Sequence, residues 1–248
     1  MSLRAFLINL DGSEARLATA TAQLDAMGLD WDRVPAVDGR GKPISAFAQY
    51  DDAACRAYMG RSMTGAEIAC HLSHARAAQA FLDSGDSHGL ILEDDFTLAE
   101  GAQADLSEVC RWLMSDAAPD WQIANLGAHK KKISTPLEKV AGRTVLRAHY
   151  FPMLATAILW TRPAAETFVK QAERIVCPSD NHYRHWQTRT NAGLSIWPPL
   201  IRAGDHPSDI DSRSQRTDKT ERTGTYGFAK QRRLWTDKLI ALRHKVVG

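Results

Sequence analysis

Short apolar runs alternate with segments of helical periodicity along most of this chain, and this alternation restricts the possible folds more than any other feature. We expect strands at residues 5–10, 32–37, 90–92, 121–126, 154–160 and 194–197. We expect helices at residues 13–27, 64–82, 104–114 and 164–174. Strands that alternate with helices usually form a largely parallel sheet covered by the helices. The sequence therefore predicts an α/β protein.

Local signals mark where some of these helices begin and end. Thr64 and Glu67 match a capping box, in which each side chain binds the backbone N–H of the other residue. Gly28 is the expected stop of the helix over residues 13–27. Residues 42–63 show no clear period, so we expect an irregular insertion over the sheet there.

Length, charge and cysteine content limit the class of protein. The 248 residues suffice for one domain with a substantial core, expected at residues 1–227, and a C-terminal helix at 228–248. A formal charge of +2 argues against a nucleic-acid partner. The cysteines are widely spaced, so we expect reduced thiols rather than a disulfide framework. Without a signal-peptide pattern or an apolar run of ~20 residues, a cytoplasmic protein is predicted.

Three carboxylates, Glu93, Asp94 and Asp95, directly follow the strand predicted at residues 90–92. Adjacent like charges resist burial, so such a run is either a solvated loop or a site for a cation. Open α/β sheets bind ligands at the carboxyl ends of their strands. The position of the run therefore favours a site, and its oxygen atoms suit a hard ion such as Mn²⁺ or Mg²⁺.

Four motifs occur in a fixed order around this run. They are I-N-L-D-G-S-E-A-R at 8–16, V-P-A-V-D-G at 34–39, T-G-A-E-I-A-C-H-L-S-H at 64–74 and L-I-L-E-D-D at 90–95. In this order and spacing they resemble glycosyltransferase family 25, which includes bacterial lipopolysaccharide and lipooligosaccharide galactosyltransferases and related collagen galactosyltransferases. The resemblance is firm over residues 4–100 and weaker at P-S-D-N-H-Y, residues 178–183.

This resemblance implies a GT-A fold, in which a Rossmann-like half binds a UDP-sugar and a D-x-D-like motif holds Mn²⁺ on the diphosphate. Here E-D-D takes the place of that motif. Asp95 is the expected direct metal ligand, Glu93 belongs to the water shell or binds the ribose, and Asp94 can exchange roles with them. His206, in a polar C-terminal flap over residues 203–227, either completes the metal shell or is a solvated loop histidine.

The same resemblance and the strand ends suggest a set of donor-binding residues. They are Asn9, Asp11, Arg16, Asp38, Ser73, His74, Glu93 and Asp94. Asn9, Asp11 and Asp38 follow the first two predicted strands, where they would hydrogen-bond uracil or ribose. Helix capping by Asp11 and a turn at Asp38 are equally open alternatives. For Ser73 and His74 the alternative is a packing or hydrogen-bonding role.

Glycosyl transfer builds positive charge on the sugar ring and negative charge on the departing UDP, which a bridging cation stabilises. In an inverting reaction, a carboxylate on the far face of the sugar removes the proton of the acceptor hydroxyl. Asp180 is our first candidate for this base, with Asp209 and Asp211 as alternatives.

We therefore predict an inverting, metal-dependent glycosyltransferase that moves a hexose, expected to be galactose, from a UDP-sugar to a lipopolysaccharide or lipooligosaccharide core. A UDP-glucose or N-acetylhexosamine donor stays open. The alternatives are a catalytically idle nucleotide-sugar-binding or scaffold protein and, less favoured, a sugar nucleotidyltransferase. A haloacid-dehalogenase-type phosphatase is excluded, because Asn9 stands where that motif has its nucleophilic aspartate.

Basic residues mark two further segments. From residue 228 onward, apolar and basic residues interleave as in a basic amphipathic helix. Its aromatic stripe is expected either to pack on the domain or to lie on an anionic bilayer, where a lipid-linked acceptor would be found. The run Lys130, Lys131 and Lys132 either contacts a diphosphate or an anionic saccharide, or is a solvated charge run.

Overall fold

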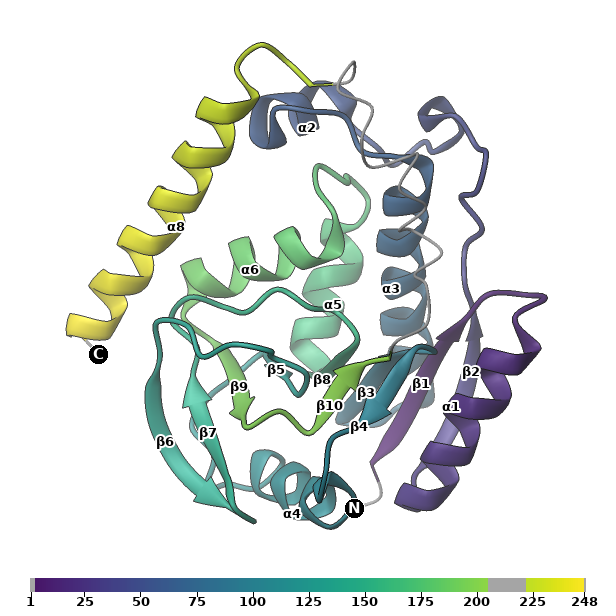
Figure 1. Cartoon of the computed structure of the whole chain (residues 1–248), viewed down its shortest axis with the longest axis vertical. Helices are drawn as coiled ribbons and strands as arrows, with labels where there is room; N and C mark the ends of the chain where they lie inside the picture. The colour runs from purple at the N-terminus through teal and green to yellow at the C-terminus, as the bar shows by residue number, and fades with distance from the viewer. Residues whose placement is uncertain (1–2, 205–221, 248) are drawn as a thin grey trace.

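The computed structural model describes residues 3–204 and 222–247 (Figure 1). Its main-sheet strands are β1 (Arg4–Asn9), β2 (Asp30–Pro35), β3 (His88–Glu93), β5 (Ile123–Asn125), β6 (Thr135–Val140), β7 (Arg143–Arg147), β8 (Ala157–Thr161) and β9 (Gly193–Trp197). They form an eight-stranded sheet in the order β2-β1-β3-β8-β5-β9-β7-β6. Strands β7 and β8 run antiparallel to their neighbours, and the other strands share one direction.

Helices cover both faces of this sheet. They are α1 (Glu14–Met27), α2 (Asp52–Met59), α3 (Gly65–Ser84), α4 (Ala102–Leu113), α5 (Arg162–Gln171), α6 (Ser179–Thr190) and α8 (Tyr226–Val247), with a short 3-10 turn η1 at Ile44–Ala46. A small second sheet pairs β4 (Phe96–Leu98) with β10 (Ile201–Ala203). The predicted α/β class, with a mostly parallel sheet flanked by helices and a C-terminal helix, is confirmed.

Alternating side chains on the strands divide the core into two layers. In β1, Ala5 and Leu7 face the cluster with α1 and α4, whereas Phe6 faces the cluster with α3, α5 and α6. In β3, Ile91 belongs to this second cluster. Because side chains alternate along a strand, Glu93 is expected on the same side as Ile91, toward α3. Glu93, the first acidic residue of the run, is therefore on the face of the sheet that α3 covers.

Helix α3 begins with the predicted capping box. Thr64 Oγ1 accepts a hydrogen bond from the Glu67 N–H (3.2 Å), and Glu67 Oε2 accepts one from the Thr64 N–H (2.9 Å). The Glu67 carboxylate also pairs with Arg61 at 2.6 Å. Glu67 therefore fixes the start of α3 and is not a free catalytic group.

Two motif glycines let the turn after β2 lie directly against the start of α3. A Cβ on Gly39 would lie 2.3 Å from the carbonyl oxygen of Gly65. A Cβ on Gly65 would in turn lie 2.5 Å from the carbonyl oxygen of Lys42. Neither distance is possible for a real Cβ, so both positions require glycine for close backbone approach. The glycines thereby fix the wall that carries Asp38.

The structure corrects the predicted organisation in two places. Residues 42–63 are not wholly irregular, since they contain α2, whose Asp51 side chain accepts a hydrogen bond from the Ala54 N–H (2.9 Å). Helix α6 was not predicted, because its buried face includes polar side chains such as Arg184 and Gln187. Ser13 occupies the N-cap position of α1 but makes no side-chain cap hydrogen bond.

Helix α8 runs along one edge of the molecule and packs on α2 and α6 (Figure 1). The predicted C-terminal helix is thus present, and it begins two residues earlier than expected, at Tyr226 rather than Phe228. No helix within residues 3–204 and 222–247 combines the length and apolar character needed to cross a bilayer. The division into a domain at 1–227 and an appendage at 228–248 stays a prediction.

Candidate functional site

A cleft lies where β1, β2 and β3 end, beside the first turns of α3. Apolar side chains, including Ile8, Val37 and Ala66, form part of its wall. The predicted site residues that line it are Arg16, Asp38, Ser73, His74, Glu93, Asp94 and Asp95. The structure thus brings together residues from all four sequence motifs of the N-terminal half.

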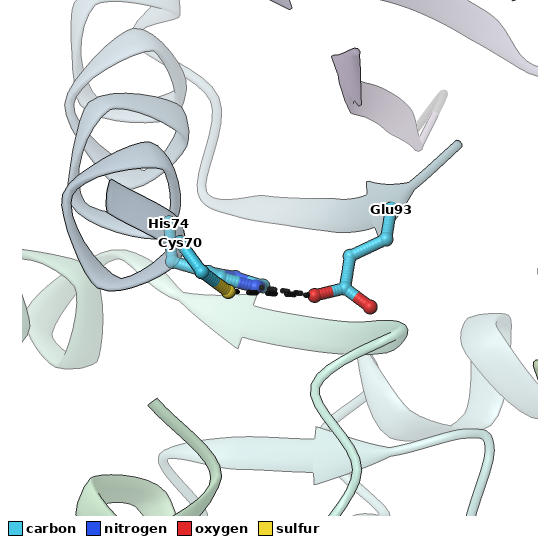
Figure 2. Close-up of side chains that lie close together, drawn as sticks. All are labelled: Cys70, His74 and Glu93. Carbon is cyan, nitrogen blue, oxygen red and sulfur yellow. Dashed lines mark hydrogen bonds and ion pairs between the residues drawn. The ribbon is translucent and has the colours of Figure 1, made fainter. Parts of the chain in front are cut away.

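Glu93 is held by hydrogen bonds on both of its carboxylate oxygens. His74 Nε2 lies 3.1 Å from Oε1, and Thr156 Oγ1 donates to Oε2 at 3.2 Å. The Cys70 thiol donates to Oε1 at 3.8 Å from one turn earlier on α3 (Figure 2). Burial opposes ionisation, but the hydrogen bond and charge of His74, the Thr156 hydrogen bond and the charge of Arg16 lower the pKa of Glu93. Glu93 is therefore a firmly positioned carboxylate.

Cys70, His74 and Glu93 form a compact group of possible metal ligands. One ligand atom of each lies within 4.8 Å of the others. Burial raises the pKa of the Cys70 thiol well above its usual range, so the thiol is protonated and serves as a donor to Glu93. The group thus has the arrangement of a hydrogen-bonded support for Glu93.

Asp94 is fixed by two partners from the first motif. Asn9 Nδ2 donates a hydrogen bond to Asp94 Oδ2 at 2.6 Å, and Arg16 forms an ion pair with Oδ1. Asn9 is itself held by Arg33, whose Nε donates to Asn9 Oδ1 at 2.9 Å. The amide of Asn9 therefore orients Asp94. Asp11 is exposed and pairs with Arg33 outside the cleft.

Asp95 is the least compensated carboxyl group of the run. Its Oδ2 lies 3.8 Å from Arg16, while its Oδ1 is buried and has no hydrogen-bond partner among the described residues. Burial, followed by the negative charges of Glu93 and Asp94, raises the pKa of Asp95 to about 6. Arg16 compensates the negative charge here only in part, and a divalent cation would supply further positive charge. The residues therefore fit the metal that the family resemblance implies.

Asp180 lies in the first turn of α6 and belongs to the same electrostatic environment. Burial and then the charge of Glu93 raise the pKa of Asp180 to about 6, while His74 and Arg184 oppose this rise. A carboxylate with a raised pKa is a stronger base than an ordinary one, yet it is still ionised at neutral pH. Asp180 is not among the residues that line the cleft, and its role as the base stays a prediction.

Ser73 and Asp38 shape the other side of the cleft. Ser73 Oγ accepts a hydrogen bond from the Val37 N–H (2.8 Å) and donates one to the Ala69 carbonyl (2.7 Å), which fastens α3 to the end of β2. Asp38 accepts hydrogen bonds from the side chain of Arg40 at 3.0 and 2.9 Å. These hydrogen bonds lower the pKa of Asp38 to about 2, so it is an anion at the rim of the cleft.

Other predicted residues lie where the structure gives no description. His206, Asp209 and Asp211 fall within residues 205–221, outside the described residues. Gly204 donates its N–H to the carbonyl oxygen of Asp95 at 2.5 Å. The backbone at Gly204 therefore contacts the carboxylate run.

Sequence reasoning missed three supporting residues of the site. Cys70 could have been predicted from the sequence, because it lies four residues before His74 on one face of a predicted helix. Thr156 and Arg33 had no local signal. Thr156 is 63 residues away from Glu93 in the chain, so only the pairing of β3 with β8 brings the two together.

The chain shows similarity to known proteins over most of its length. A curated relative from Anopheles gambiae, described as a "Glycosyltransferase 25 family member", is 30% identical over 120 residues, which is 43% of this chain; the chain covers only 20% of that relative. A solved structure, "a glycosyltransferase involved in the glycosylation of the major capsid of PBCV-1", aligns with this chain with a TM-score of 0.36 and 7% identity. The alignment covers 69% of this chain and 65% of that one. The family model described as "Glycosyltransferase family 25 (LPS biosynthesis protein)" matches residues 2–183, a range that includes the predicted site residues from Asn9 to Asp180 but not His206, Asp209 and Asp211. On this match the chain belongs to glycosyltransferase family 25.

Proposed function

We propose that this glycosyltransferase is metal-dependent and inverting, and that it moves a hexose from a UDP-sugar to a hydroxyl group of a lipopolysaccharide or lipooligosaccharide core. Family membership supports transfer of a sugar. The observation that carries the finer proposal is the carboxyl group of Asp95, which has a raised pKa and a buried oxygen, Oδ1, without a hydrogen-bond partner among the described residues. This group is suited to a cation that is itself bound by a diphosphate.

In this proposal Asp95 would be the primary ligand of Mn²⁺ or Mg²⁺, and Asp94 and Glu93 would bind the ion directly or through water. When bound, the ion neutralises the charge that develops on the departing diphosphate. Asn9 and Arg16 keep Asp94 oriented, and His74 and Thr156 do the same for Glu93. The protein thus supplies a rigid set of oxygen atoms before the donor arrives.

Asp180 is proposed to activate the acceptor. As the acceptor hydroxyl oxygen bonds to the anomeric carbon, the bond from that carbon to UDP breaks and the hydroxyl proton passes to the Asp180 carboxylate. This is supported by the raised pKa of Asp180, which results from its burial near Glu93. The bond electrons leave with UDP, so the transfer needs no further reactant.

The nucleoside is proposed to bind against the apolar wall of Ile8, Val37 and Ala66. Asp38 stands at the rim of this wall, where its carboxylate can accept hydrogen bonds from ribose hydroxyls. Galactose is our proposed donor sugar on the strength of the family resemblance.

We propose that the enzyme works in the cytoplasm, at the membrane that carries its lipid-linked acceptor. All four cysteines are free, which suits a reducing compartment. This placement is independent of the donor chemistry.

Release of UDP from a panel of UDP-sugars tests the proposed activity, because slow donor hydrolysis needs no acceptor. We expect release from one donor with Mn²⁺, loss of release with excess chelator, and loss in Asp95→Ala. The exposed residue Asp116 provides the matched control, since Asp116→Ala removes a carboxylate that does not line the cleft. Absence of release from every donor, together with no Mn²⁺-dependent UDP binding, would favour an idle nucleotide-sugar-binding protein.

A further inference from the structure

Helix α8 carries a continuous apolar stripe that the domain does not cover. Its large apolar side chains are between 48% and 85% exposed at Phe228, Trp235, Leu239, Leu242 and Val246. With 3.6 residues per turn, these positions fall within an arc of about 60° on the helix. One narrow face of α8 is therefore apolar along the length of the helix.

The opposite face of α8 fixes the direction of this stripe. Asp237, about half a turn away from the stripe, is completely buried and pairs with Arg189 at 2.8 Å and Arg184 at 3.7 Å. Ala229 and Ala241 are buried on the same side. The stripe therefore points outward. Among the described residues it does not pack on the domain, which was one of the two alternatives that the sequence left open.

Positive charges border the stripe on both sides. Arg232 and Arg243 fall on one flank, and Lys238 and Lys245 fall on the other, by the same helical spacing. The one acidic residue within α8 is the buried Asp237. An apolar stripe between basic flanks is the pattern of a helix that lies in the interface of an anionic bilayer. The same flanks would repel each other across a dimer of two α8 helices.

A neighbouring cavity extends the positive charge beyond the helix. Lys130 and Lys132 line it together with Lys238 and Lys245 from α8. Met153, which is 40% exposed, adds an apolar side chain to its wall. Basic residues near an anionic membrane surface each strengthen binding, and this attraction falls off over a Debye length.

We propose that α8 binds the surface of an anionic lipid bilayer, with the helix parallel to the membrane and the stripe from Phe228 to Val246 inserted among the lipid headgroups. This goes beyond the proposed activity, because it requires neither UDP nor a metal. Helix α6 connects α8 with the site. Its first turn carries Asp180, and its last turn carries Arg189, which pairs with Asp237 of α8. These two positions are about 14 Å apart along the helix axis.

Flotation of the full chain with vesicles tests this proposal. The probes are vesicles of phosphatidylcholine alone and vesicles of phosphatidylcholine with phosphatidylglycerol. We expect binding to the anionic vesicles and weaker binding at high salt. Leu239→Glu should lose about tenfold in binding, because it replaces a leucine that inserts into the bilayer with a charge that anionic lipid repels. Leu137→Glu is the matched control, since it makes the same change at an exposed position on β6.

The outcomes separate this proposal from the proposed activity. Failure of the wild-type protein to bind anionic vesicles, or equal binding by Leu239→Glu, would overturn the membrane proposal whatever the enzyme transfers. A dimer in sedimentation velocity that Leu239→Glu dissociates would also overturn it, since the stripe would then bind a second copy. If Leu239→Glu folds poorly, the charge-reversed pair Lys238→Glu and Lys245→Glu gives the same test. UDP release without vesicles should be unchanged in all these variants.

Discussion

The substitution Asp95→Asn should stabilise the metal-free protein while it abolishes activity. Burial and the neighbouring carboxylates raise the pKa of Asp95 from 3.8 to about 6, so ionisation of this group opposes folding. The folded-state value is the higher one, so the contribution of Asp95 to stability is present below pH 3.8 and is lost as pH rises through about 6. A difference of about 2 pKa units corresponds to about 3 kcal/mol of unfolding free energy.

Urea unfolding with excess chelator measures this quantity. At pH 8 we expect Asp95→Asn to exceed the wild type by about 2 to 3 kcal/mol, with little difference near pH 4, since asparagine does not titrate. Asp116→Asn should show no such gain, because Asp116 is exposed. Added Mn²⁺ should stabilise the wild type more than Asp95→Asn, because only the wild type retains the proposed ligand. The reasoning is refuted if Asp95→Asn gains no stability at pH 8, or if Mn²⁺ stabilises both proteins equally.

Three further substitutions test other parts of the molecule. Asp180→Asn should lower kcat by about 10² to 10⁴-fold without weakening UDP binding. In the wild type, kcat/KM should rise as the pH passes through about 6, which is the raised pKa of Asp180. If the variant keeps the same pH profile, Asp180 is not the base. Gly39→Ala should destabilise the fold by about 2 to 3 kcal/mol, because its Cβ would lie 2.3 Å from Gly65 O, and urea unfolding will show whether it does. Asp237→Ala should lower the free energy of unfolding by about 3 kcal/mol, because it leaves Arg184 and Arg189 without their buried partner. The variant should also make α8 more sensitive to limited proteolysis. Resistance equal to that of the wild type would argue against Asp237 as the anchor of α8.

The features that the sequence predicted are those with a local signal. The period of the apolar residues identified the strands at the centre of the sheet, and the T-x-x-E spacing identified the start of α3 at Thr64. The E-D-D run was placed correctly at the end of β3 because a continuous apolar run, which is buried in the structure, precedes it.

The features that it did not predict depend on contacts between distant segments. Helix α6 was not predicted because its polar residues Arg184 and Gln187 are buried against partners distant in the chain, so the sequence shows no apolar period for its buried face. The hairpin of β6 and β7 lies at the edge of the sheet, and the residues of β6 are largely exposed, so it had little apolar pattern. The support of Glu93 by Thr156 requires the whole sheet to be assembled first.

The central claim is that the carboxylates after β3 hold a divalent cation together with a nucleoside diphosphate. Calorimetric titration of UDP into the protein, first with Mn²⁺ and then with excess chelator, tests this claim most directly. We predict strong binding with Mn²⁺ and at least a tenfold weaker affinity with chelator or in Asp95→Ala. Equal UDP affinity with and without the ion, or undiminished Mn²⁺-dependent binding in Asp95→Ala, would contradict the claim.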